Sequence, residues 1–180
     1  MRARLGTTLL AVCTLPLTVV AGAQAQNPVT NGLRAIEQRY AKNIVDAAEE
    51  MPADKYGYKP TPAQMTFGDV VAHLVREGND YLCGAASGQK APDRGKVTGT
   101  DPKDKLVGLL KASFEFCQTA FAAIQDAQLG DSIDFFGGRK VTKAVAALIT
   151  VADWADHYSQ MAIYLRLNGH LPPTAKKAGD

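Results

Sequence analysis

Basic residues are neither abundant nor clustered in this sequence. Its 180 residues include 20 lysines and arginines against 18 acidic residues, and no run of basic residues is longer than Lys176-Lys177. Proteins that bind nucleic acid need a basic stripe, because they displace counterions from the phosphates. We therefore expect no nucleic acid among the partners of this protein.

Internal repeats, low-complexity stretches and runs of alternating β-branched residues are also absent. No expected helix is strongly cationic with an apolar opposite face, which argues against a membrane-surface protein. The composition, with 46% hydrophobic and 21% charged residues, is typical of a folded globular protein. The length suits one domain with a hydrophobic core of its own.

The first 25 residues have the pattern of an export signal. Arg2 and Arg4 form a short positive region, residues 5–20 are mostly apolar, and Ala23-Gln24-Ala25 offers the small residues that signal peptidase accepts. An uncleaved membrane anchor is the alternative, but the apolar run is short and Pro16 interrupts it. We expect cleavage after Ala25, a periplasmic or secreted protein without stable membrane insertion, and a mature domain of residues 26–180.

Closely spaced cysteine pairs are missing. Cys13 falls within the expected signal, so the mature domain keeps Cys83 and Cys117, which lie 34 positions apart and lack the C-x-x-C spacing of redox or zinc motifs. An even pair in an exported protein favours a disulfide. Two buried thiols that act as small hydrophobic side chains are the alternative. Neither cysteine is expected to be catalytic.

Four segments repeat apolar residues at intervals of three and four, which is the spacing of an amphipathic helix. Thr66 and Asp69 form a capping-box pattern at the start of the second segment, and Gly169 is placed to end the fourth. The sequence predicts an all-α antiparallel four-helix bundle. Long loops on both sides of the second helix permit a crossed topology. The expected helices cover about 29–50, 66–86, 101–128 and 142–168.

Histidine is scarce, and two of the three histidines carry the candidate chemistry. Asp153 and His157 are four residues apart, so on a helix they are offset by ~6 Å and ~40° and can face one atom. A buried carboxylate needs a cation or hydrogen-bond donors, and a metal ion with His73 as third ligand would satisfy it. A weak surface pair Asp153–His157 and a core histidine at position 73 are the alternative. His170 is expected to be exposed and without a role.

Residues 67–74, 79–83 and 156–169, followed by Pro172-Pro173, form three stretches that together resemble the DinB-like (YfiT-type) metalloenzyme superfamily. The resemblance spans about Asn31 to Pro173 and implies a four-helix bundle in which three histidines hold a divalent metal. His73 matches the first ligand and His157 the third, whereas Asp153 stands at the position of the second. Two histidines and one carboxylate still suit zinc, nickel, iron or manganese, but the departure can equally mark a lost site. The stretches are residues 67–74 (FGDVVAHL), residues 79–83 (NDYLC), and residues 156–160 (DHYSQ) leading into 164–169 (YLRLNG).

Two functions of different classes follow from these residues. The first is an exported metal-dependent hydrolase or thiol transferase acting on a small molecule, with Asp156 or Glu77 as a general base if either points inward. Hydrolysis suits export better, because an exported protein meets little reduced thiol. The second is a non-catalytic bundle that binds a small molecule or protein partner, or forms a homodimer, around a buried polar network. The two differ in geometry, because metal ligands need donor atoms within ~4 Å of one another.

Overall fold

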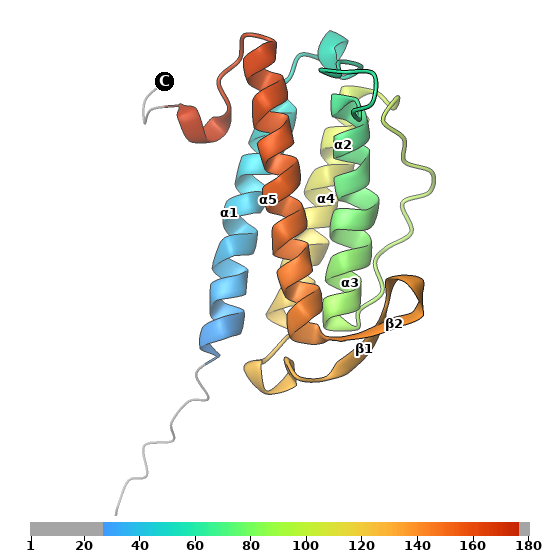
Figure 1. Ribbon diagram of the computed structural model, residues 1–180, viewed down its shortest axis with the longest axis vertical. Coiled ribbons are helices and arrows are strands. Elements are labelled where there is room, and N and C mark those ends of the chain that lie inside the picture. The colour runs from blue at the N-terminus through green and yellow to red at the C-terminus, as the bar shows by residue number, and fades with distance from the viewer. Residues whose placement is uncertain (1–26, 177–180) are drawn as a thin grey trace, which may run out of the picture.

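Four helical rods form the body of the molecule in this computed structural model, which describes residues 27–176 (Figure 1). The predicted export signal and its cleavage site lie outside these residues. α2 and α3 are joined by a π-helical turn, Leu74–Tyr81, into one continuous rod. The fold is therefore the all-α four-helix bundle that the helical periodicity predicts. The helices are α1 (Pro28–Glu50), α2 (Phe67–His73), α3 (Leu82–Ser87), α4 (Lys103–Ala122) and α5 (Lys143–Leu167).

The rods are connected in a crossed topology and not in a simple up-and-down order. The segment 88–102 runs back along the outside of the bundle, so α4 begins at the same end as α2 (Figure 1). As a result α1 is parallel to its neighbour α5, and the α2–α3 rod is parallel to α4. The predicted antiparallel packing holds for α1 against α4 and for the α2–α3 rod against α5.

A small β-hairpin closes the lower end of the bundle in Figure 1, between the third and fourth helices, where the sequence predicts no strand. β1 (Ser132–Phe135) pairs antiparallel with β2 (Arg139–Thr142). Gly137 and Gly138 turn the chain with φ of 65° and 71°, a region that glycine adopts without strain. The strands escape sequence analysis because they are short and because only Phe135 in β1 is buried, so no alternating pattern develops.

Helix ends agree with the capping signal at the start of α2 and depart from expectation at the end of α4. Thr66 Oγ1 accepts a hydrogen bond from the Asp69 N–H at 3.0 Å, and this capping box starts α2 as predicted. α4 ends at Ala122, well before the expected end near residue 128. The chain leaves the helix there because Asp126 caps α1, accepting hydrogen bonds from the backbone N–H groups of Val29 (3.0 Å) and Thr30 (2.8 Å).

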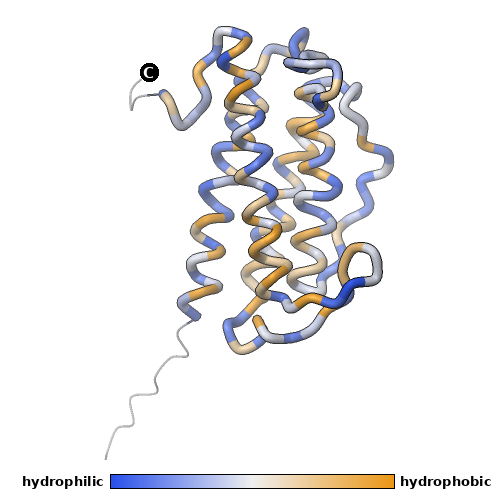
Figure 2. The backbone as a smooth tube through the Cα atoms, viewed as in Figure 1, coloured by the Kyte–Doolittle hydropathy of each residue, from blue (hydrophilic) through white to orange (hydrophobic). Residues whose placement is uncertain are grey.

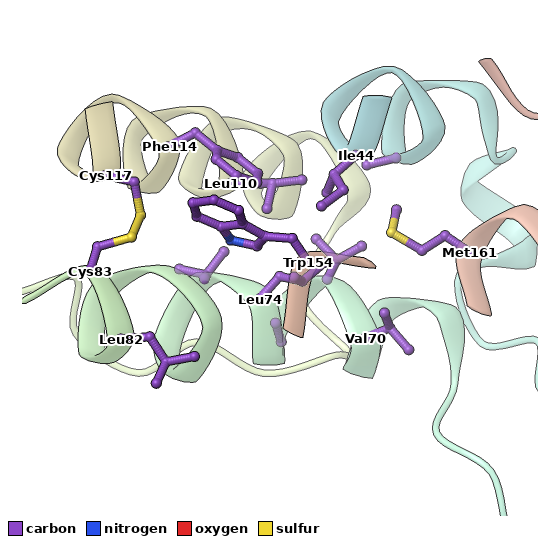
Figure 3. Packing of buried hydrophobic residues seen from close by; sticks show 14 of the residues in the cluster. Ile44, Val70, Leu74, Leu82, Cys83, Leu110, Phe114, Cys117, Trp154 and Met161 are labelled. Carbon is purple, nitrogen blue, oxygen red and sulfur yellow. A yellow bond between two sulfur atoms is a disulfide. The ribbon is translucent and has the colours of Figure 1, made fainter. Parts of the chain in front are cut away.

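The core lies between all four rods and is centred on the fully buried Trp154 (Figure 3). Hydrophobic and hydrophilic residues alternate around each helix, as Figure 2 shows, so every rod contributes an apolar face. A disulfide joins Cys83 of α3 to Cys117 of α4, with Cα atoms 5.2 Å apart, so the two cysteines are not separate thiols. Among residues 27–176, no helix combines the length and apolarity that a membrane span requires.

Candidate metal centre

His73, Asp153 and His157 lie together between the α2–α3 rod and α5. Each offers one donor atom, and these atoms lie within 4.8 Å of one another, a little wider than the ~4 Å expected of metal ligands. Asp153 Oδ1 is 3.4 Å from His73 Nε2 and also 3.4 Å from His157 Nε2. The packing thus brings together the three residues singled out in the sequence, although 80 positions separate His73 from Asp153.

A buried hydrogen bond sets the register of α5 against the α2–α3 rod. Trp154, the neighbour of Asp153, donates from Nε1 to Asn79 Oδ1 at 2.7 Å. Asn79 belongs to the π-helical turn and donates in turn to Ser113 Oγ at 2.8 Å. Because all three side chains are buried, this chain of hydrogen bonds is well protected from water and holds Asp153 at the level of the π-helical turn.

The three candidate ligands differ in exposure. The side chain of His157 is 9% exposed, whereas those of His73 and Asp153 are 26% and 19% exposed. The cluster is therefore closed on the His157 side and reaches solvent beside His73. Asp153 Oδ2 and His157 Nδ1 are buried and have no hydrogen-bond partner within the described part of the chain.

The charges of these groups depend on one another. Burial acts to raise the pKa of the Asp153 carboxyl, but hydrogen bonds and charges from His157 and His73 outweigh it and lower that pKa to about 2. Burial acts to lower the pKa of His157, but the hydrogen bond and charge of Asp153 outweigh it and raise that pKa. Asp153 is therefore ionised at neutral pH, as a metal ligand must be.

The two carboxylates considered as general bases occupy different places. Glu77 Oε2 is a buried atom 3.4 Å from His73 Nδ1 and 3.4 Å from Arg76 Nε, but it makes no hydrogen bond within the described part of the chain. Asp156 is exposed and accepts a hydrogen bond from Gln160 Nε2 at 2.9 Å, so it does not point inward. Of the two, only Glu77 faces the cluster.

His170 does not have the free, exposed position expected for it. Its Nδ1 lies 3.2 Å from Glu50 Oε1, and Lys176 Nζ contacts the other oxygen of the same carboxylate at 2.6 Å. These contacts fasten the segment after α5 to the end of α1. The pairing joins residues 120 positions apart, so no local pattern in the sequence points to it.

The π-helical turn and Gly78 are the parts of the site that sequence analysis missed. An ideal Cβ on Gly78 would lie 2.6 Å from Asp153 Oδ2, so the carboxylate occupies the space of an absent side chain. A glycine in the middle of a predicted helix was the available signal, because glycine weakens helices and needs a reason to be there.

Sequence comparison places the chain in a family. The family model described as the DinB superfamily matches residues 36–161, and the chain belongs to that superfamily. The uncharacterized protein YjoA of Bacillus subtilis (strain 168) is 25% identical over 127 residues, which are 69% of this chain and 81% of YjoA.

Solved structures share the bundle. The crystal structure of the DinB-like protein YjoA from Bacillus subtilis has a TM-score of 0.63 at 24% identity, covering 78% of this chain and 93% of YjoA. A DinB-like protein from Bacillus cereus ATCC 10987 has a TM-score of 0.66 at 16% identity, covering 79% and 95% of the two chains. A conserved protein from Enterococcus faecalis has a TM-score of 0.63 at 19% identity, covering 77% and 96%. At these sequence identities, the structural similarity shows a shared fold and nothing more.

Proposed function

We propose that this protein is an exported, divalent-metal-dependent enzyme of hydrolase or thiol-transferase type. The observation that carries the proposal is the convergence of His73 Nε2, His157 Nε2 and an ionised Asp153 carboxylate in one partly open cluster. Asp153 itself fits the same interpretation, because a largely buried ionised carboxylate is costly without a partner charge and a cation would stabilise it. Two imidazoles and one carboxylate suit zinc, nickel, iron or manganese.

The residues of the chain divide the work of such a site. His73, Asp153 and His157 would hold the metal, which when bound would lower the pKa of a water molecule or a substrate thiol. Glu77 Oε2 lies 3.4 Å from His73 Nδ1, and a hydrogen bond from that nitrogen would orient the ring so that Nε2 faces the cluster, as carboxylates commonly do for metal-bound histidines. The solvent-exposed part of His73 marks the side from which a small substrate would enter.

Export is part of the proposal and has two supports. One is the pattern of positive, apolar and small residues over positions 1–25. The other is the disulfide between Cys83 and Cys117, because disulfides persist in oxidising compartments.

A metal-free bundle is the second candidate, and the charge state of His157 favours it. The raised pKa of His157 stabilises a protonated imidazole beside the Asp153 carboxylate, and such a pair needs no metal. In that case the cluster would stabilise the contact between α5 and the α2–α3 rod, and the protein would act by binding a small molecule or another protein.

Metal content separates the two candidates. Protein purified after export, or as residues 26–180, is reconstituted at neutral pH with Zn²⁺, Ni²⁺, Fe²⁺ or Mn²⁺ and measured by plasma mass spectrometry. We expect one equivalent of metal, its loss in His73→Ala, and its retention in the control His170→Ala, whose ring lies outside the cluster. If the wild-type protein holds no metal under any of these conditions, the proposed metal-dependent enzyme is wrong and the metal-free binding protein is supported.

A further inference from the structure

Gly78 lies directly against the Asp153 carboxylate. Besides the 2.6 Å approach to Asp153 Oδ2, a Cβ on Gly78 would come within 3.3 Å of Leu74 Cδ2. The backbone at Gly78 does not have a positive φ, so the chain conformation does not call for glycine there. Steric room for a neighbouring side chain is the remaining reason for a residue that disfavours helices.

The packing of Trp154 opposes a separation of α5 from the α2–α3 rod that would make that room in another way. Trp154 is fully buried and packs against Phe114 and Phe121, with ring centroids 5.8 and 5.7 Å away. Its hydrogen bond to Asn79 links the residue after Asp153 to the residue after Gly78. An added methyl group at position 78 would therefore be accommodated by movement of the Asp153 side chain.

The π-helical turn brings Gly78 to the same face of the rod as His73. Residues five apart in an α-helix point ~140° away from each other. The hydrogen bonds of a π-helix span five residues, so residues with this spacing come closer to one face. The turn begins directly after His73 and includes Gly78. The π-helical turn therefore places both His73 and the space left by Gly78 on the side of the rod that faces α5.

We propose that Gly78 is a positioning residue that leaves the space in which the Asp153 carboxylate is held toward His73 and His157. This inference rests on the proposed metal site, because it assigns Gly78 the task of admitting the carboxylate ligand.

Cobalt binding tests the proposal, since bound Co²⁺ reports its ligands by visible absorption. We expect Gly78→Ala to raise the Co²⁺ dissociation constant at least tenfold and to change the absorption bands. Gly108→Ala is the matched control, because Gly108 is an exposed glycine in α4 with nothing within 4 Å of an added Cβ. That control should bind Co²⁺ as the wild type does.

A double-mutant cycle separates positioning from a general structural role. In an Asp153→Ala background the carboxylate is gone, so Gly78→Ala should change Co²⁺ affinity less than twofold further. Equal losses in both backgrounds, or a Gly78→Ala variant with wild-type affinity and spectrum, would overturn the proposal. If Gly78→Ala does not fold, folding restored in the double variant supports the steric account, and continued failure contradicts it.

The proposal about Gly78 can be tested even if the proposed metal site is wrong. If wild-type protein binds no Co²⁺, the metal site fails, and crystal structures of metal-free wild type and Gly78→Ala decide the inference about Gly78. A longer distance between the Asp153 carboxylate and His73 Nε2 in the variant supports it, whereas an unchanged distance overturns it.

Discussion

Two carboxyl groups on different sides of the bundle respond to burial in opposite ways. Glu37 of α1 is 2% exposed and borders a cavity of about 380 Å³ between α1 and α4. Burial raises its pKa to about 7, and no hydrogen bond or ion pair to it occurs within residues 27–176. Asp153 of α5 is also largely buried, yet His73 and His157 lower its pKa to about 2. Burial without a partner therefore favours the neutral form of a carboxyl group in this bundle. The Asp153 carboxyl stays ionised because two imidazole rings contact it.

The disulfide ties the α2–α3 rod, which carries His73, to α4, and its removal should change stability more than any other substitution considered below. Replacing Cys83 and Cys117 together by serine should reduce the free energy of unfolding by about 4 kcal/mol, because a closed loop of this size restricts the unfolded chain. Urea denaturation with and without reductant measures the change. Wild type under reducing conditions should behave like the double variant, and equal stability of all samples would contradict the prediction.

Glu37 makes the stability of the protein depend on pH. Its pKa is higher in the folded state than in the unfolded state, so its protonated form favours folding. This contribution is fully present below the unfolded pKa of 4.5 and is lost as pH rises through about 7. Glu37→Gln should remove the dependence and, at pH 8, raise the free energy of unfolding by about 3 kcal/mol. Urea midpoints between pH 4.5 and 8 would show it, and parallel curves for variant and wild type would refute it.

Removing the charge of Asp153 should be harmful, in contrast to Glu37, because the proposed metal site uses the negative charge of Asp153 to bind the ion. Asp153→Asn keeps the shape of the side chain and removes the charge, so metal affinity should fall by about 100-fold, which corresponds to about 2.7 kcal/mol. Competition titration with a zinc or cobalt indicator measures the affinity. Glu37→Gln is the control and should bind metal like the wild type. A similar loss in both variants would mean that the comparison between the two carboxyl groups is wrong.

Substitution of Glu77 should have the smallest effect on metal affinity, and it allows a comparison of the two acids near the site, Glu77 and Asp156. Glu77→Gln should weaken metal binding about tenfold, because the carboxylate that orients His73 is replaced by an amide. Asp156→Asn, on the exposed face of α5, should leave the affinity unchanged. The same titration measures both variants. A loss in Asp156→Asn with none in Glu77→Gln would reverse the roles assigned to these two acids.

Much of the fold could be predicted because helices are local structures. The spacing of apolar residues and the Thr66–Asp69 capping box reflect contacts within a few residues, so the four rods were found within a few residues of their ends except at α4. The end of α4 was missed because Asp126 caps α1, and that contact joins Asp126 to Val29 across 97 positions. The hairpin was missed because short, mostly exposed strands carry no periodic signal.

For the candidate metal centre, local helix geometry was enough to show which groups could act together on one helix. Asp153 and His157 share a face through the helical period alone. Three further relations come from the packing of the rods: His73 reaches the pair, Glu77 rather than Asp156 faces the cluster, and Gly78 makes room for the carboxylate. The reason is that these relations depend on the register between α5 and the α2–α3 rod. That register is set by packing and by the Trp154–Asn79 hydrogen bond, which joins residues 75 positions apart.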